Sequence, residues 1–145
     1  MRDLPRQLTA EELRELFEGR TRLVERLAET ENPLEHAEGV IATLSEAEKI
    51  EALSAHPAIG AKGLSTRSAA EQGADADPAV LTELAYLNQV YEEKFGFRFV
   101  VFVAGRPKRE ILKVLGERIG NTRDEELDTG MRELVAIARD RWTRT

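Results

Sequence analysis

The chain has 145 residues, 41% of them hydrophobic and 33% charged, which is the composition of an ordinary globular protein long enough to bury one core. The 27 acidic residues outnumber 21 basic ones, so the net charge of −6 argues against nucleic acid as a partner. With no cysteine and two histidines, the sequence excludes disulfides and a cysteine nucleophile and leaves little for a metal site. We expect one cytoplasmic domain over residues 1–145 with no membrane partner, because no signal peptide or membrane-spanning run is visible.

Three helix starts are predicted by a hydroxyl residue that is followed three positions later by a glutamate. In this spacing the two side chains satisfy free N–H groups of the first helical turn, as a capping box. The pairs are Thr9 with Glu12, Ser45 with Glu48, and Thr122 with Glu125. Apolar positions between residues 33 and 53 predict two short helices that are separated at Ser45.

Proline and glycine mark the ends of two further helices. The first begins at Asp77-Pro78 and ends at Gly96, and the second begins at Pro107 and ends at Gly120. This assignment follows because proline is favoured at the first helical position and glycine directly after the last one.

The segment from 97 to 103 reads FRFVVFV, and its aromatic and β-branched side chains are typical of a strand. No second segment of this kind is present in the sequence, and a lone strand leaves its backbone groups unsatisfied. We therefore expect an extended buried connector between two helices, or an extension of helical structure. The predicted fold is all-α, a single-domain helical bundle with one extended apolar segment (97–103). The polar stretch from 60 to 77 has the length of a functional loop.

His56 stands at the end of a predicted helix and directly before Pro57, which disfavours helical dihedrals at the histidine. An imidazole that titrates near neutrality can carry protons in catalysis. The alternative is a structural cap, in which a partly cationic ring meets the helix dipole. The position in the sequence leaves both roles open.

Ser68, Glu71 and Gln72 form a polar group within the long polar stretch. Ser68 and Glu71 have capping-box spacing, so they can simply begin a short helix. Because Gly73 follows at once, that helix would be brief, and its single turn would hold a hydroxyl, a carboxylate and an amide. These three polar side chains do not serve to stabilise a hydrophobic core.

The last helix carries an apolar stripe that Arg141 continues. The stripe consists of Leu127, Met131, Leu134 and Ala138, at steps of four, three and four residues. Arg139 falls well off this stripe. A guanidinium at the end of an apolar stripe either extends to water or is kept inside to bind an anion or a planar pair of oxygens.

Three motifs in this order resemble one family, the 2-oxo-4-hydroxy-4-carboxy-5-ureidoimidazoline (OHCU) decarboxylases of urate breakdown. The motifs are AHPAIG at 55–60, SAAEQG at 68–73 and LNQVYEEKFGFRFV at 87–100. The resemblance continues to Arg141 and covers roughly residues 34–142. Each motif alone is weak, whereas the ordered set is specific.

The resemblance implies an all-helical, cofactor-free enzyme that converts OHCU to (S)-allantoin and carbon dioxide, and it suggests a homodimer. The residues that match the family's catalytic histidine, catalytic glutamate and substrate-binding arginine are His56, Glu71 and Arg141. The positions that match its pocket lining are Pro57, Ser68, Gln72 and the backbone of Phe99 and Val100. Arg98 stands where proline is common and Arg67 where a large aromatic residue is common, which bears on substrate preference.

Cofactor-free decarboxylation is chemically reasonable because the imidazoline C=N bond can accept the electron pair left on the ring carbon. We expect His56 to act on the hydroxyl and carboxylate side of OHCU, Glu71 to hold ring or ureido N–H groups and assist proton transfer, and Arg141 to pair with substrate oxygens.

Two alternatives to this function stay open. One is a non-enzymatic helical interaction module with a groove between the 60–77 and 97–103 segments; the other is a lyase or hydrolase for a related ureido or imidazoline compound.

Overall fold

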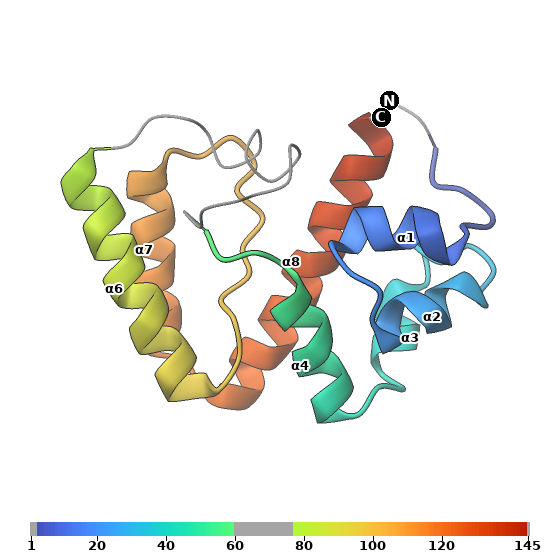
Figure 1. Ribbon diagram of the computed structural model, residues 1–145, viewed down its shortest axis with the longest axis horizontal. Helices are drawn as coiled ribbons and strands as arrows, with labels where there is room; N and C mark the ends of the chain where they lie inside the picture. The colour runs from blue at the N-terminus through green and yellow to red at the C-terminus, as the bar shows by residue number, and fades with distance from the viewer. Residues whose placement is uncertain (1–2, 60–76, 145) are drawn as a thin grey trace.

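The long C-terminal helix crosses the molecule between two groups of helices (Figure 1). The computed structural model describes residues 3–59 and 77–144, and within these ranges it has seven α-helices and no strand. In chain order they are α1 (Ala10–Phe17), α2 (Arg22–Ala28), α3 (Ala37–Ile41), α4 (Glu46–Ala55), α6 (Pro78–Phe95), α7 (Lys108–Ile119) and α8 (Arg123–Arg144). The predicted all-α class is confirmed.

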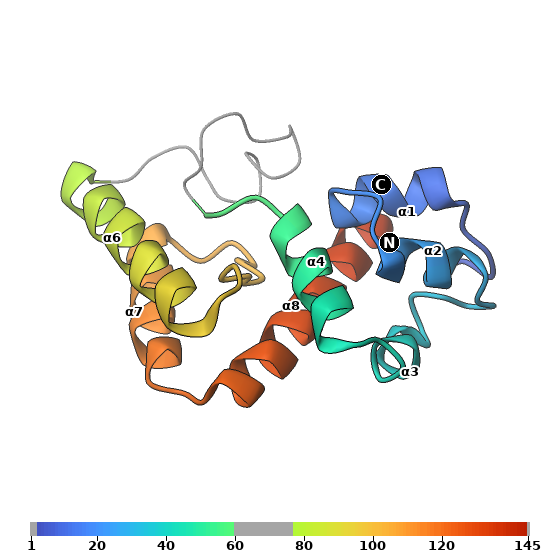
Figure 2. The same cartoon turned by 60° about the horizontal axis from the view of Figure 1, so that its bottom comes forward.

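The two groups of helices meet along α8. α6 and α7 pack against each other on one side, whereas α1, α2 and α3 pack together on the other (Figures 1 and 2). α4 contacts both α2 and α8. A Cβ at Gly130 of α8 would lie 3.1 Å from Cδ2 of Leu53, so the glycine lets α4 approach α8 closely. This crossing brings the C-terminal end of α4 beside α8.

The predicted helix starts and ends are confirmed. At α1 the Glu12 N–H donates to Thr9 Oγ1 (3.1 Å) and the Thr9 N–H donates to Glu12 Oε1 (3.0 Å). The same reciprocal pair of bonds begins α4 and α8. Asp77 caps α6, Gly96 ends it in the left-handed conformation with φ 80°, and α7 lies between Pro107 and Gly120.

One helix, α2, is missing from the sequence-based assignment. The Thr21 hydroxyl accepts from the Val24 N–H (3.4 Å), so α2 has a hydroxyl cap. A capping box has a glutamate or glutamine at the third helical position, whereas α2 has Val24 there. The sequence of α2 therefore shows only the hydroxyl half of the capping-box pattern. Leu23, Val24 and Leu27 of α2 are fully buried, so tertiary packing stabilises this short helix.

The segment from 97 to 103 is an extended connector between α6 and α7, which confirms the first of its two interpretations; it does not extend a helix. Side chains from α7 and α8 take the place of a neighbouring strand. The Arg118 Nη1–H donates to the Val100 carbonyl (2.8 Å), and the Phe102 N–H donates to Glu133 Oε1 (3.2 Å). Backbone groups that a sheet would pair are thus satisfied by long polar side chains.

Aromatic rings join this connector to α6. The ring centroid of Tyr91 lies 4.6 Å from that of Phe95, 6.0 Å from that of Phe97 and 5.3 Å from that of Phe99. All four side chains are buried, and tilted or edge-on contacts of this kind stabilise a core beyond the area that they bury. The cluster fixes Phe99, and with it the neighbouring Val100, against α6.

A buried carboxylate completes this anchor. Glu126 is fully buried, and its Oε1 accepts from Arg118 Nε (2.7 Å) and from the Tyr91 hydroxyl (2.7 Å). Asn121 Nδ2 donates to the other oxygen (2.9 Å). Burial, and next the hydrogen bond to Glu126, raise the pKa of Tyr91 well above its usual range, so the phenol keeps its proton and donates. Because Arg118 also holds the Val100 carbonyl, the network fixes the backbone of the connector.

None of the helices within the two described ranges is long and apolar enough to cross a membrane.

Candidate active site

His56 lies at the C-terminal end of α4. Its backbone is extended, with φ −80° and ψ 135°, which is the conformation that Pro57 imposes on the preceding residue. The His56 N–H still bonds the Leu53 carbonyl (3.2 Å), and the residue is only 7% exposed. The helix exit therefore turns the imidazole into the interior of the molecule.

The imidazole of His56 is uncharged at neutral pH. Burial lowers its pKa from 6.5 to about 4; the positive charges of Arg141 and Arg98 act in the same direction, and Glu18 opposes them. His56 is the C-cap residue of α4, as the structural alternative requires, but its lowered pKa disfavours the partly cationic ring that this alternative assumed. Its Nδ1 is buried and has no hydrogen-bond partner among the described residues. A neutral ring with an uncommitted nitrogen can accept or relay a substrate proton.

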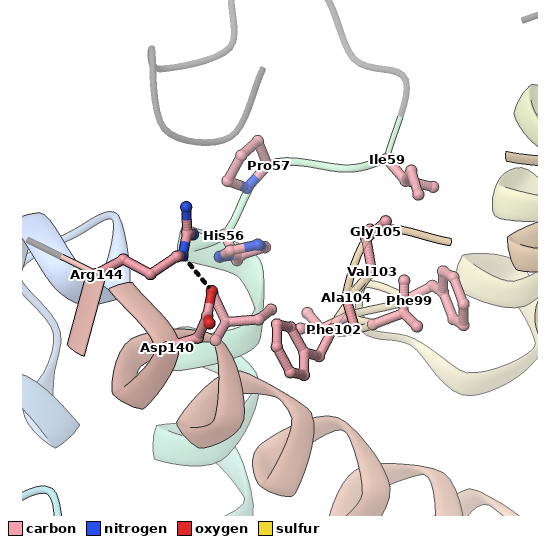
Figure 3. A pocket seen from close by; sticks show the side chains of 13 residues that line it. His56, Pro57, Ile59, Phe99, Phe102, Val103, Ala104, Gly105, Asp140 and Arg144 are labelled. Carbon is pink, nitrogen blue, oxygen red and sulfur yellow. Dashed lines mark hydrogen bonds and ion pairs between the residues drawn. The ribbon is translucent and has the colours of Figure 1, made fainter. Parts of the chain in front are cut away.

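A cavity of about 400 Å³ opens beside His56, a size suited to a small ligand. Three segments that are distant in the sequence line it (Figure 3). They are the exit of α4 (His56, Pro57 and Ile59), the connector and following turn (99–105), and the last turns of α8 (Ile137, Asp140 and Arg144). Pro57, Phe99 and Val100, which the sequence predicted as lining residues, all lie in this wall.

Arg141 is 2% exposed, so its predicted alternative, a side chain that extends to water, is wrong. Its Nη1 donates to the Leu16 carbonyl at the end of α1 (3.0 Å) and lies 3.2 Å from Glu18 Oε1. Arg141 is not among the described residues that line the cavity, but its charge acts on His56, which does line it.

Arg139 points elsewhere, as its helical phase predicts. Its side chain is 34% exposed, its Nε donates to the Leu34 carbonyl (2.8 Å), and its Nη2 pairs with Glu38 (2.9 Å). Two arginines that are two positions apart on α8 are thus separated by rotation of the helix, with Arg141 inside and Arg139 against the start of α3.

Arg98 has a structural role beside the site that sequence reasoning missed. Its Nη1 donates to the carbonyls of His56 (2.8 Å) and Ser54 (3.2 Å), and its Nε lies 3.5 Å from Glu92 Oε1. The side chain therefore ties the exit of α4 to the connector. The proline that is common at this position in the resembled family cannot make these bonds, so Arg98 adds a link between α4 and the connector.

Asp140 and Arg144 were also missed as cavity residues. Arg144 Nε donates to Asp140 Oδ2 (2.7 Å) at the edge of the cavity (Figure 3). Their spacing of four positions on a helix predicts an ion pair, and this was the only signal that the sequence offered. The pair gives this edge of the cavity both an acceptor and a donor.

Ser68, Glu71 and Gln72, with Arg67, lie outside the described residues. Of the predicted site, the structure brings His56, Pro57, Phe99 and Val100 together around one cavity. In residues 3–59 and 77–144, no group of three or more histidine or acidic side chains is arranged to hold a metal ion.

Comparison with known proteins gives a consistent result. A family model described as OHCU decarboxylase matches residues 2–143. The chain is 33% identical over 104 residues to the uric acid degradation bifunctional protein of Bacillus sp. (strain TB-90), covering 68% of this chain and 21% of that protein. It is 31% identical over 99 residues to the 2-oxo-4-hydroxy-4-carboxy-5-ureidoimidazoline decarboxylase of Halalkalicoccus jeotgali, covering 65% of this chain and 56% of that protein.

The fold is also that of a solved relative. A crystal structure of OHCU decarboxylase in the presence of (S)-allantoin matches with a TM-score of 0.77 and 25% identity, covering 92% of this chain and 96% of that one. The two sequence relatives are longer, so the chain spans 21% of the first and 56% of the second. The family match over nearly the whole chain, together with the cavity at His56, shows that this chain belongs to the OHCU decarboxylase family.

Proposed function

We propose that this protein is a cofactor-independent carboxy-lyase that converts OHCU to (S)-allantoin and carbon dioxide in urate breakdown. The observation that carries the proposal is a buried, uncharged histidine in the wall of a 400 Å³ cavity, at the position that matches the family's catalytic histidine. The matched solved protein was crystallised in the presence of (S)-allantoin, which is the proposed product.

The electrons of the reaction need no sink beyond the substrate. When the bond from the ring carbon to the carboxylate breaks, carbon dioxide leaves and the electron pair moves toward the adjoining C=N bond, whose nitrogen takes a proton. The hydroxyl then loses its proton as a carbonyl forms, and the neighbouring ring carbon is protonated. One proton is taken up overall by the carboxylate form of OHCU. The protein has to orient the carboxylate and allow protonation of one face only.

His56 is suited to act on the hydroxyl and carboxylate side. Its neutral ring can accept the hydroxyl proton, and a substrate carboxylate bound beside it would raise the pKa of His56 and strengthen it as a base. Arg141 would pair with substrate oxygens through its planar guanidinium, and Glu71 would hold ring or ureido N–H groups and assist proton transfer. Pro57, Ser68, Gln72 and the backbone of Phe99 and Val100 would line the pocket.

The test is the decay of OHCU generated in situ from urate by urate oxidase and the hydrolase that follows it. We expect the absorbance of OHCU to fall at a rate proportional to the concentration of this protein, and to do so equally after exhaustive chelation. Decay at the background rate would reject the enzymatic proposal, whereas loss with EDTA and recovery with a metal would reject only its cofactor-free form.

We also propose that the protein forms a homodimer in the cytoplasm and binds neither nucleic acid nor a membrane. Residues 1–145 would form a single domain. The acidic net charge of −6 supports the lack of a nucleic-acid partner, and the family resemblance supports the dimer. Sedimentation velocity gives the mass in solution, and a mass of 16.3 kDa at micromolar concentration would reject the dimer.

A further inference from the structure

We propose that Glu18 is a positioning residue, which holds the guanidinium of Arg141 in the orientation that substrate binding requires. The inference rests on the proposed function, because it assigns Arg141 to substrate oxygens. It adds a residue from the N-terminal part of the chain that lies outside the three motifs of the family resemblance.

The contact itself is buried and specific. Arg141 Nη1 lies 3.2 Å from Glu18 Oε1, and the two side chains are 0% and 14% exposed. The same nitrogen donates to the Leu16 carbonyl (3.0 Å), one of the carbonyls that the end of α1 leaves without a helical partner. The Leu16 carbonyl and the Glu18 carboxylate thus face the same nitrogen and hold this arm of the planar guanidinium against the end of α1.

The backbone conformation of Glu18 fixes where its carboxylate lies. Glu18 caps α1 in the left-handed conformation, with φ 64° and ψ 21°, although this conformation is favourable mainly for glycine. A non-glycine residue held there is strained, and such strain persists where the surrounding structure uses it. In the right-handed conformation the chain would continue α1, and the carboxylate would no longer be placed by this turn.

The neighbouring Gly19 is required for close packing. A Cβ at Gly19 would lie 2.9 Å from the Cβ of Ala55, so only glycine permits this approach between the end of α1 and the end of α4. Ala55 directly precedes His56. The Glu18-Gly19 turn is thus packed against the helix exit that carries His56, with Glu18 directed to Arg141.

The charges around His56 show what Glu18 does there. Burial is the largest cause that lowers the pKa of His56, Arg141 from α8 and Arg98 from the connector lower it further, and among the described residues Glu18 raises it. Asp140 and Arg144, which line the same cavity, pair with each other. Without the carboxylate of Glu18, the positive charge of Arg141 would act on the imidazole with less opposition, and the orientation of its guanidinium would loosen.

Three variants test the proposal. Glu18→Gln removes the charge and keeps the shape, Glu18→Gly removes the carboxylate and relieves the strained backbone, and Glu15→Gln is the control on the exposed face of α1. We expect kcat/KM for OHCU to fall ~10- to 100-fold in both Glu18 variants, mainly through KM, because misplaced binding groups cost rates of this order. Thermal melts show whether both Glu18 variants stay folded, and Glu15→Gln should match wild type.

The second readout does not depend on the substrate. The chain has only two histidines, so NMR titration resolves His56 with the exposed His36 as an internal reference. In Glu18→Gln the titration of His56 should move to lower pH than in wild type. A folded Glu18→Gln or Glu18→Gly variant with wild-type kcat/KM, or an unmoved His56 titration, would overturn the inference. A wild-type protein that is inactive on OHCU would reject the proposed function instead, and the His56 titration would still decide whether Glu18 acts on the site.

Discussion

At the scale of single residues, burial decides the chemistry of His56. The ring lies at a helix exit where sequence alone allowed a cationic cap, but the surrounding packing and two arginines make the charged form unfavourable. The same packing surrounds the guanidinium of Arg141 with a carboxylate and a carbonyl. These two residues therefore have environments that surface histidines and arginines lack.

Substitution of His56 by asparagine should abolish most of the activity and preserve the fold. A positioned proton carrier contributes ~10² to 10⁴ in rate, and asparagine cannot titrate. His36→Asn is the matched control, because His36 is exposed at the start of α3. The readouts are kcat for OHCU and far-UV circular dichroism. Equal activity in the two variants would mean that His56 has only a structural role.

The depressed pKa of His56 predicts a loss of stability in acid. An unfolded histidine takes up a proton near pH 6.5, whereas the folded one resists protonation until about pH 4. The unfolded state therefore binds more protons between these values, and the free energy of unfolding should fall as the pH falls from 6.5 to 4. The full effect is roughly 3 kcal/mol. Urea unfolding of wild type and His56→Asn across this range measures it, and parallel curves for the two proteins would contradict it.

Arg141→Lys should impair catalysis where Arg139→Lys does not. Lysine keeps the charge but lacks the planar fork, so kcat/KM should fall roughly 10²-fold at position 141. At position 139 the lysine can keep its ion pair with the exposed Glu38, and kcat/KM should stay unchanged. Thermal melts of both variants confirm that they fold. Equal, small effects on kcat/KM would remove Arg141 from the proposed site.

At the scale of elements, the sequence predicted best what is encoded locally. Capping boxes gave the starts of α1, α4 and α8, and the proline and glycine positions gave the starts and ends of α6 and α7. It missed α2, whose stability comes from three buried side chains. It placed the connector as extended, but the side chains that satisfy its backbone, above all Arg118, come from other helices and leave no local pattern.

The buried network at Glu126 should be essential for stability. Glu126→Gln removes the negative charge and leaves Arg118 as an uncompensated buried cation, which destabilises proteins by about 3 to 5 kcal/mol. Asp128→Asn, at an exposed position of the same helix, should change the free energy of unfolding by less than about 0.5 kcal/mol. Urea denaturation midpoints provide the comparison. A Glu126→Gln midpoint equal to that of the control would show that the network does not anchor the connector.

At the scale of the whole molecule, the cavity is built from segments near residues 56, 100 and 140 (Figure 3). Periodicity and capping cannot bring such segments together; only the family resemblance placed His56, Pro57, Phe99 and Val100 in one site. The resemblance could not reveal the Arg98 bond to the His56 carbonyl or the contact between Arg141 and Leu16, which is 125 positions away in the sequence. Those contacts depend on how the helices pack around α8.

Because uncatalysed decay of OHCU has no preferred face, the handedness of the allantoin product distinguishes catalysis by this protein from spontaneous decarboxylation. OHCU is generated in situ, this protein is added, and the circular dichroism of the allantoin product is followed with time. We expect an (S)-allantoin signal that grows in proportion to the concentration of protein, since a site that fixes the ring permits protonation of one face. Racemic allantoin formed at the rate seen without the protein would mean that this protein is not an OHCU decarboxylase.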